Sequence, residues 1–357
     1  MRLSFYNKLI FLLKCLVVCI LLLAYPANFI SPESIWWVAL FGLGYPFIIY
    51  ANLIFILYWG LLRKKLFLLS TFAILVGFNY TLNLLQFNFN NTLPQDSHAV
   101  KIMSFNVHLF DVYNWKHNKE GRLKIYKMLG QNTPDIACFQ EFYTSNGEHF
   151  NNMDSLIAFL NDSSHHEAGR LQNIHFETTF RNGKDNQFGI ATFSGYPIIN
   201  KGRIPFPQIT QNICIFSDIK IGNDTLRVYN MHLQSIRFAK EDYHFIEKIE
   251  ELPRQEEING SNRILKRLRT AFILRAQQVD IVAAHIRHSP YPVIVCGDFN
   301  DSPSSYTYNV IANELKDSFA EAGYGFGKTY AGPLPSFRID YILHDQKFSA
   351  YEYRTIR

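Results

Sequence analysis

The stretch VIVCGDFND, residues 293–301, decides the fold. Its first four residues form a continuous apolar run, which is typical of a strand buried on both faces. Asp298, Asn300 and Asp301 then follow in quick succession. Asp298 and Asn300 are two residues apart and therefore project to the same side. Ligands bind at the strand ends of open α/β sheets, so this strand predicts a cleft that receives a carboxylate and an amide. A tight Gly-Asp turn that merely ends a strand is the alternative.

Four further strand-like segments carry polar residues in apolar surroundings. Each one alone is commonly part of the hydrogen-bonded structure. Five strands that each bring a carboxylate, amide or imidazole favour one shared site. The residue types suit a hard divalent cation held by few carboxylates, together with donors for a developing oxyanion. The four segments are SFNV with Asn106, CFQE with Glu141, VYNMHL with Asn230 and His232, and FRIDYIL with Asp340.

In this order and spacing, SFNV, PDIACFQE, FGIATFSGYPI, NMHL, GDFND and RIDYIL resemble the endonuclease/exonuclease/phosphatase superfamily, over about residues 99–345. The superfamily includes DNases, inositol polyphosphate 5-phosphatases and neutral sphingomyelinases. The resemblance implies an α/β (α+β) four-layer sandwich, in which two mixed β-sheets face each other with helices outside. It also implies Mg²⁺-dependent cleavage of a phosphate ester by an activated water, with Mn²⁺ as a second cation to test.

The resemblance assigns roles to five residues. Glu141 matches the principal metal ligand, and Asn106 lies close to the metal and the phosphate. Asp298 matches the carboxylate that orients or deprotonates the attacking water. Asn300 matches the amide that holds a phosphate oxygen, and His232 the histidine that contacts the phosphate and helps protonate the leaving oxygen.

Asp340 matches an aspartate that orients a second histidine, which the superfamily carries in a final Ser-Asp-His motif. No such motif occurs in the 17 residues that follow Asp340, and His344 lies in a turn-like context that does not match it. Every earlier motif is intact, so we expect a domain truncated at its C-terminus. A degenerate, inactive member and replacement by another residue are the alternatives. Loss of the carboxylate–histidine pair is expected to cost several orders of magnitude in rate.

Three more residues are candidates near this site. Asn230 is expected to bind substrate from the same strand face as His232. Arg338 either contacts a substrate phosphate or pairs with a carboxylate, and its position beside Asp340 does not decide between the two. His108 is expected on the same side as Asn106, outside the first layer of contacts.

The first 87 residues predict a membrane anchor with three transmembrane helices. Residues 9–25, 35–62 and 66–87 are each apolar over about the 20 residues that a bilayer requires. Lys14 lies inside the first span and is expected to extend toward the N-terminal interface. Residues 88–98 read as a polar linker, and residues 99–357 as the phosphoesterase-like domain.

Basic residues predict the orientation of these spans. Arg2 and Lys8 precede the first span, and residues 63–65 (RKK) join the second to the third, whereas the loop between the first two carries only Glu33. The positive-inside rule places the N-terminus in the cytoplasm. Three spans then place the catalytic domain in the periplasm, or outside the cell, of a bacterium whose inner membrane holds the protein.

The distribution of charged residues limits the classes of molecule that the globular part is expected to bind. The chain has 35 Lys and Arg and 30 Asp and Glu; residues 1–87 hold six and one of these, which leaves 29 of each in the remainder. The globular part therefore lacks the cationic surface of a non-specific nucleic-acid binder. The charge-dense segment 236–262 is expected to be a solvated helix or loop, with an active-site lid as the alternative. A basic cluster could still follow a phosphate backbone, although such runs are usually solvated helix faces: Arg263, Lys266, Arg267 and Arg269.

Two classes of function remain. The chain is expected to be a membrane-anchored phosphoesterase that acts on nucleic acid, a lipid head group or a soluble ester. The alternative is a non-catalytic binding or scaffold protein that retains the fold, which the missing histidine supports. A transporter is disfavoured, since the spans carry no internal charged residue beyond Lys14.

Overall fold

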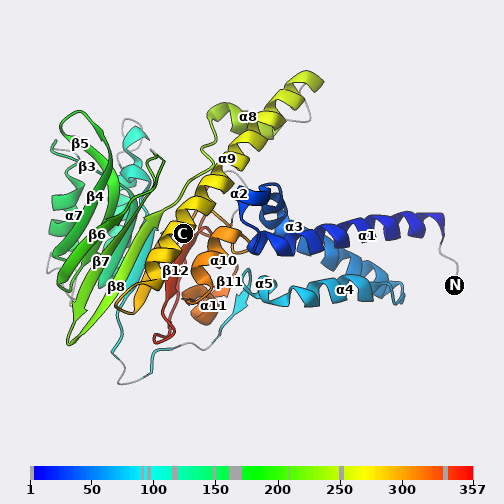
Figure 1. Ribbon diagram of the computed structural model, residues 1–357, viewed down its shortest axis with the longest axis horizontal. Coiled ribbons are helices and arrows are strands. Elements are labelled where there is room, and N and C mark those ends of the chain that lie inside the picture. The colour runs from blue at the N-terminus through cyan, green and yellow to red at the C-terminus, as the bar shows by residue number, and fades with distance from the viewer. Residues whose placement is uncertain are drawn as a thin grey trace.

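The computed structural model describes residues 4–89, 92–94, 98–114, 120–147, 150–160, 171–208, 210–248, 253–332 and 337–356. A helical region at the N-terminus precedes an α/β domain (Figure 1). Part of the expected linker, residues 90–91 and 95–97, lies outside the described residues. The helices are α1 Phe5–Ala24, η1 Tyr25–Asn28, α2 Pro32–Ile35, α3 Val38–Leu61, α4 Phe67–Val76, α5 Phe78–Leu82, η2 His108–Asn114, α6 Glu120–Asn132, α7 Asn152–Leu160, α8 Lys240–Lys248, α9 Arg254–Arg287, α10 Tyr306–Ala312 and α11 Ser318–Ala322.

Two mixed sheets form the α/β domain, as predicted. The larger sheet has the strand order β10-β12-β9-β8-β7-β6, and the smaller has the order β2-β3-β5-β4. One strand pair in each sheet is parallel, β8 with β9 and β2 with β3, and the other pairs are antiparallel. The strands are β1 Gln86–Phe87, β2 Ile102–Asn106, β3 Ile136–Ser145, β4 Asn173–Asn182, β5 Asn186–Ser194, β6 Ile198–Ile204, β7 Ile213–Ile221, β8 Asp224–His232, β9 Val293–Asp298, β10 Lys316–Asp317, β11 Tyr324–Gly325 and β12 Asp340–His344.

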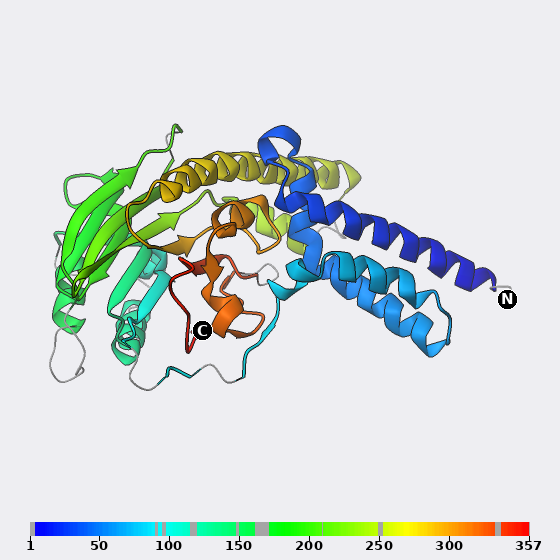
Figure 2. The same cartoon turned by 60° about the horizontal axis from the view of Figure 1, so that its bottom comes forward.

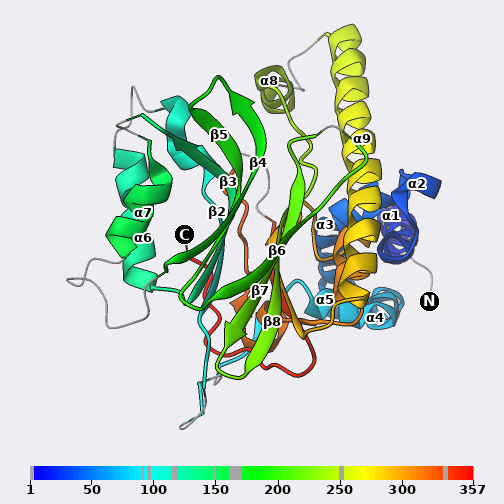
Figure 3. The same ribbon diagram turned by 60° about the vertical axis from the view of Figure 1, so that its left-hand side comes forward.

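The sheets and helices stack in four layers, with α6 and α7 on one outer side and α9 on the other (Figure 3). Three apolar clusters hold the layers together. One joins the six-stranded sheet to α9 and α10, one joins the four-stranded sheet to α6 and α7, and one lies between the sheets. Cys138 of β3 and Cys296 of β9 belong to the cluster between the sheets, where both are fully buried free thiols.

The helical region differs from three continuous spans. Two helices, Phe5–Asn28 and Val38–Leu61, are long and apolar enough to cross a membrane, by length and composition alone. Only 22% of each apolar window is buried, which distinguishes them from the core helices of a soluble domain. The third expected span is interrupted, because α4 ends at Val76 and α5 begins at Phe78. A Cβ atom at Gly77, between them, would lie 2.0 Å from the ring of Tyr25.

The third expected span also ends early. Its last two residues, Gln86 and Phe87, form β1, which pairs antiparallel with β11 of the α/β domain. Lys14 does not extend toward the interface: its side chain is fully buried and its Nζ donates to the carbonyl of Leu66. The aligned helices α1, α3 and α4 project from the α/β domain, and the N-terminus lies at their far end (Figure 2).

The charge-dense segment 236–262 forms α8 and the first part of α9 in its described portion. Most of these helical residues are exposed, as expected of a solvated helix, but one acidic side chain is not. Asp242 of α8 is fully buried and pairs with Arg263 (2.6 Å) and Arg267 (2.8 Å) of α9. Two members of the basic cluster thus neutralise a carboxylate of the same chain.

Candidate active site

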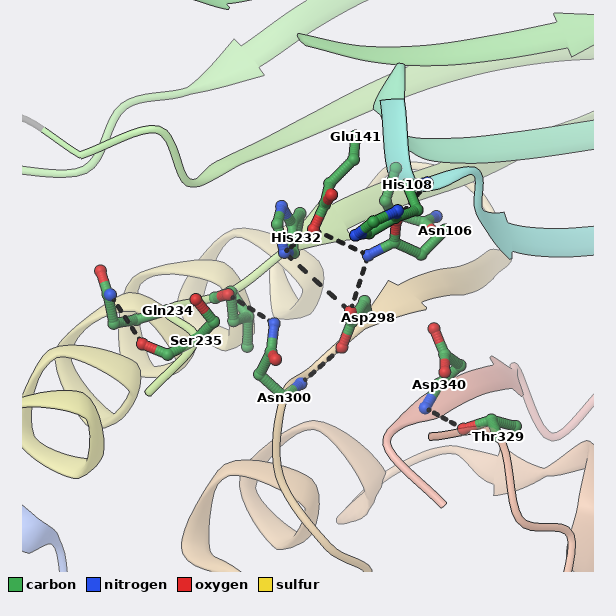
Figure 4. A network of polar contacts seen from close by, with 12 residues as sticks. Asn106, His108, Glu141, His232, Gln234, Ser235, Asp298, Asn300, Thr329 and Asp340 are labelled. Carbon is green, nitrogen blue, oxygen red and sulfur yellow. Dashed lines mark hydrogen bonds and ion pairs between the residues drawn. The ribbon is translucent and has the colours of Figure 1, made fainter. Parts of the chain in front are cut away.

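The two sheets meet at one end around a cluster of polar side chains (Figure 4). Asn106 ends β2, and its Nδ2 donates to Oε1 of Glu141 (3.1 Å) and to Oδ2 of Asp298 (3.0 Å). His232 ends β8, and its Nε2 lies 3.7 Å from Glu141 Oε1 and 4.0 Å from Asp298 Oδ2. These four residues come from four strands and both sheets, as the sequence pattern predicts for one shared site.

Strand register places Asp298 and Asp340 beside each other. Asp298 is opposite His232 in the parallel pair β8–β9 and opposite Asp340 in the antiparallel pair β9–β12. Gly297 permits this close arrangement, because a Cβ atom there would lie 2.2 Å from the carbonyl oxygen of Met231. A glycine before the carboxylate is therefore a packing requirement of the neighbouring strand.

A β-bulge directs Glu141 into the site. The pairing of β3 with β5 shifts between Phe139 and Phe142, and Glu141 has a left-handed φ of 49°. Consecutive strand residues normally point to opposite faces. Here Gln140 and Glu141 both contact β8, since Gln140 Nε2 donates to Asn230 Oδ1 (2.8 Å) and Glu141 approaches His232. Left-handed backbone is costly for a residue other than glycine, and such positions cluster at functional sites.

The chain after Asn106 is also in an unusual conformation. His108, Leu109, Phe110 and Asp111 all have φ between 45° and 57°. The fully buried ring of Phe110 holds this left-handed turn by packing on Phe142. The turn aims the backbone N–H of His108 at Oδ1 of Asn106 (3.0 Å), so the carboxamide nitrogen faces the two carboxylates. His108 itself is exposed at the edge of the cluster (Figure 4).

Asn300 follows Asp298 in a left-handed conformation, with a φ of 54°. Its backbone N–H donates to Asp298 Oδ1 (2.8 Å), and its Nδ2 donates to the carbonyl of Leu233 (3.0 Å). Within the described residues, one of the two amide hydrogens is engaged in this way, which leaves the other able to donate to a ligand.

Burial and, after it, neighbouring negative charge raise the pKa values of two carboxyl groups in the site. Burial raises the pKa of the Asp298 carboxyl, and Glu141 raises it further, against the opposing effect of His232 and the hydrogen bond from Asn106. Burial, together with Asp298 and Glu141, raises the pKa of Asp340 well above its ordinary value. Oδ1 of Asp340 is buried without a hydrogen-bond partner in the described part of the chain, while its backbone N–H donates to Thr329 Oγ1 (3.1 Å).

These residues fit a divalent cation that keeps most of its water. Among the described residues, no group of three or more His, Cys, Asp or Glu side chains is arranged to hold a metal ion. Mg²⁺ does not need such a cage, because it is usually bound by one or two carboxylates and several waters. Glu141 of β3 and Asp298 of β9, both within reach of Asn106 and His232, supply the one or two carboxylates that a hard cation of this kind requires. Asn106 presents its nitrogen to this site, so its expected role as a metal ligand stays a prediction that needs rotation of the carboxamide.

The two residues expected to bind substrate lie elsewhere. Asn230 is fully buried between the sheets, where its Nδ2 donates to the carbonyl of Ala191 (2.9 Å). Arg338 is 3% exposed, and its Nη1 pairs with Asp317 Oδ2 (2.7 Å). Of the two roles open to Arg338, the structure contains the ion pair. Substrate binding by either residue stays a prediction that this burial disfavours.

The sequence reasoning missed the partner of Asp301. Arg275 of α9 is 1% exposed and donates through Nε to Asp301 Oδ2 (3.0 Å). A signal was present in the helix, because Arg275 lies on the apolar face three and four residues from Phe272 and Ala271. A charge at such a position requires a buried counter-charge.

A family model, Endonuclease/Exonuclease/phosphatase family, matches residues 103–356. The chain therefore belongs to this family, whose members are metal-dependent phosphoesterases. A second model, Domain of unknown function (DUF8431), matches residues 7–84.

Solved structures resemble this fold at low sequence identity. A family protein from Leptotrichia buccalis is 12% identical, with 70% of this chain and 89% of that one covered and a TM-score of 0.43. The human Nocturnin catalytic domain with bound sulfate and a family protein from Bacteroides thetaiotaomicron are each 16% identical, with 69% of this chain and 82% of theirs covered and TM-scores of 0.44. No curated protein matches the chain.

Proposed function

We propose that this protein is a membrane-anchored, Mg²⁺-dependent phosphoesterase that hydrolyses a phosphodiester or phosphomonoester. The observation that carries the proposal is the convergence of Asn106, Glu141, His232 and Asp298 on one end of the sandwich, with Asp340 on the next strand. Three acidic side chains beside a single histidine are stable when a cation or a proton compensates the excess negative charge.

Each side chain has a role in this chemistry. Bound Mg²⁺ would be held by Glu141 and would offset charge on the phosphate oxygens. Asp298, whose pKa is raised, is a stronger base than an ordinary aspartate, and its ionised form accepts the proton of the attacking water. Asn300 donates its remaining amide hydrogen to a phosphate oxygen. His232, within reach of both carboxylates, holds the phosphate and delivers a proton to the leaving oxygen.

The test uses the purified full-length chain in detergent micelles. Hydrolysis of bis-p-nitrophenyl phosphate, plasmid DNA and sphingomyelin is measured with Mg²⁺ and with EDTA. We expect Mg²⁺-dependent turnover of at least one substrate, which Glu141→Ala and Asp298→Ala abolish. Asp224→Ala is the matched control, since Asp224 is an exposed carboxylate at the opposite end of the strand that carries His232. A folded wild type without turnover favours the binding or scaffold alternative.

The three substrates also separate the substrate classes. The neutral charge of residues 88–357 and the pairing of Arg263 and Arg267 with Asp242 favour a lipid-derived or soluble ester over duplex DNA. Preferential cleavage of plasmid DNA would contradict this preference and leave the phosphoesterase assignment intact.

We further propose that α1, α3 and the broken helix formed by α4 and α5 cross a bacterial inner membrane, with the N-terminus in the cytoplasm and the α/β domain outside. Exposed apolar side chains on α1 and α3 support contact with lipid. The C-terminal end of α3 points away from the α/β domain (Figure 2), and the basic residues 63–65 follow it in the sequence. In a variant without Cys15 and Cys19, an impermeant maleimide added to spheroplasts should label Asp224→Cys and not Lys65→Cys. The reverse labelling would overturn the orientation.

A further inference from the structure

The loop that follows the catalytic strand contacts the N-terminal helices. It leaves β9 at Asp298 and reaches Ser305, which caps α10 by accepting from the backbone N–H of Tyr308 (3.2 Å). Midway along it, Ser304 is 1% exposed. A Cβ atom built on Gly42 of α3 would lie 2.6 Å from the carbonyl oxygen of Ser304 and 2.9 Å from Cβ of Ala27 in η1. The absence of a side chain at position 42 therefore allows the helix backbone to pack directly on this loop.

The same loop is anchored at Asp301, three residues after the proposed catalytic carboxylate Asp298. Asp301 accepts from Arg275 Nε (3.0 Å) and from Thr307 Oγ1 (2.9 Å), and its carbonyl accepts from the hydroxyl of Tyr341 (2.8 Å). These bonds fix the loop on the side of α9, α10 and β12, while Gly42 fixes it on the side of α3. The turn between the two anchors is itself tied together, since the N–H of Ser302 donates to Asp301 Oδ1 (3.0 Å) and the N–H of Ser305 to the carbonyl of Ser302 (3.2 Å). A displacement of Ser304 therefore strains the bonds of Asp301 and reaches Asp298 through them.

A second contact reaches the strand that bears Asp340. Arg338 precedes Asp340 by two residues, and its Nη2 donates to the carbonyl of Asn83, just after α5 (3.0 Å). Its guanidinium also lies over the rings of Phe319 (4.5 Å) and Tyr341 (4.6 Å). The helical region thus touches both segments that present the acidic groups of the larger sheet.

Further contacts hold the helical region against the outer side of α9. Gln277 Nε2 donates to Glu33 Oε2 (2.8 Å), and the guanidinium of Arg269 lies over the ring of Trp36 (5.9 Å). A simple tether would need none of these contacts, because the polypeptide between α5 and β2 already joins the two regions.

We propose that the N-terminal helices are a positioning element of the active site, with Gly42 as the residue through which α3 sets the loop from Asp298 to Ser305. Only the kinetic measurement in the test below rests on the proposed function, and the hydrogen-exchange measurement does not. A side chain at position 42 pushes on the backbone of Ser304 and moves Asp298 and Asn300 relative to Glu141 and His232. Misplacement of reacting groups by about 1 Å can cost on the order of 100-fold in rate.

The test compares Gly42→Leu and Gly42→Ala with Gly60→Leu and Gly60→Ala in the full-length protein. Gly60 lies in the same helix, is exposed, and has nothing within 4 Å of a Cβ atom. Intrinsic helix propensity changes equally at the two positions, so a difference between them reports the contact with Ser304. Hydrogen exchange of the amides from Asn300 to Thr307 is measured alongside kcat and KM.

We expect Gly42→Leu to speed exchange in this loop and to lower kcat at least 10-fold per folded molecule with little change in KM. Gly42→Ala should show the same changes to a smaller extent, and both Gly60 variants should match the wild type. Unchanged exchange and kcat in folded Gly42→Ala would overturn the proposal. If the wild type hydrolyses none of the substrates, the exchange measurement alone decides, which separates this inference from the proposed function.

A second variant distinguishes the two neighbours of Gly42. Ala27→Gly removes the contact with η1 and leaves the contact with Ser304. If the double variant Gly42→Ala/Ala27→Gly recovers normal exchange and kcat, the effect arises within the helical region and the proposal is wrong. If the defect persists, it is transmitted through Ser304. Because this comparison uses Gly42→Ala, it still tests the proposal if Gly42→Leu fails to fold.

Discussion

The two faces of the six-stranded sheet carry two charged clusters that differ in charge balance. On the face toward α9, Arg227 donates to Asp218 through Nε (2.6 Å) and Nη2 (2.9 Å), and Asn200 Nδ2 donates to Asp218 Oδ2 (2.9 Å). On the face toward the smaller sheet, Glu141, Asp298 and Asp340 gather beside His232. Arg227 and His232 both belong to β8, at positions five apart that project to opposite faces.

The difference between the clusters concerns charge balance. Asp218 has a bidentate cationic partner, which lies over the ring of Phe216 (4.1 Å) and completes a neutral unit. In the described part of the chain, the only positively chargeable group within ion-pair distance of the site carboxylates is His232. The balanced cluster leaves no uncompensated charge in the interior, whereas the unbalanced one is maintained at a cost to stability. This contrast supports the assignment of the second cluster to cation binding and catalysis.

The largest expected effect is the loss of turnover in Asp298→Asn. The substitution removes the base and leaves the shape, so we expect kcat with Mg²⁺ to fall by about 10³-fold or more. Asp218→Asn should leave kcat within about twofold at a temperature where it is folded. Steady-state hydrolysis of the best substrate provides the measurement. Equal losses in the two variants would remove the distinction between the clusters.

The next effect is on stability, and its sign differs between the clusters. Asp218→Asn leaves Arg227 buried without its counter-charge and should lower the free energy of unfolding by about 3 kcal/mol. Asp340→Asn removes a buried like charge and should raise the melting temperature of the metal-free protein. Thermal unfolding in EDTA, followed by circular dichroism, measures both. A destabilised Asp340→Asn would show that its carboxyl is already compensated.

Addition of Mg²⁺ should stabilise the wild type through the site cluster alone. At a free concentration 100 times the dissociation constant, the gain is about 2.7 kcal/mol. We expect Glu141→Gln to lose this gain and Asp218→Asn to keep it. Thermal shift against Mg²⁺ and Mn²⁺ titrations measures the gain, with Asp224→Ala as the matched control. Retention of the full shift in Glu141→Gln would place the cation elsewhere.

The smallest effect is a pH dependence in the metal-free protein. The pKa of Asp340 is raised in the folded state, so the folded protein holds a proton that the unfolded chain releases near pH 4. Stability is therefore lost as the pH rises from about 4 through the folded-state pKa. Asp340→Asn does not titrate, so its advantage in melting temperature over the wild type should grow with pH and vanish in acid. A constant difference across pH would contradict the raised pKa.

Local patterns in the sequence were enough to predict an α/β or α+β domain and the strands that carry the site residues Asn106, Glu141, His232, Asp298 and Asp340. The two mixed sheets were expected only from the resemblance to the family. Period-two alternation of apolar and polar residues, and continuous apolar runs, involve only neighbours along the chain. Both can therefore be recognised in the sequence without the structure. The pattern also suggested Asn230 as a substrate-binding residue and left Arg338 open between a substrate phosphate and a carboxylate. In the structure both are buried with protein partners, and Arg338 pairs with a carboxylate. Spacing indicates that a polar residue faces inward, but not whether it faces a ligand or another residue.

Several decisive features depend on contacts between distant segments. The bulge at Glu141, the left-handed turn after Asn106 and the pairing of Arg275 with Asp301 are each held by side chains far away in the sequence. The third expected span is another case. Its apolar composition favoured one long helix, but Tyr25 packs at Gly77 and β11 captures Gln86 and Phe87 as a strand.

The sequence by itself determined which residue types reach the ends of the strands, because burial and period-two alternation are local properties of the chain. Only the tertiary structure decided which of them share one cluster, which are neutralised by a partner, and how α3 packs on the loop after Asp298. Those outcomes depend on the close packing of backbone and side chains from separate elements, and on electrostatic balance among groups that no sequence spacing relates.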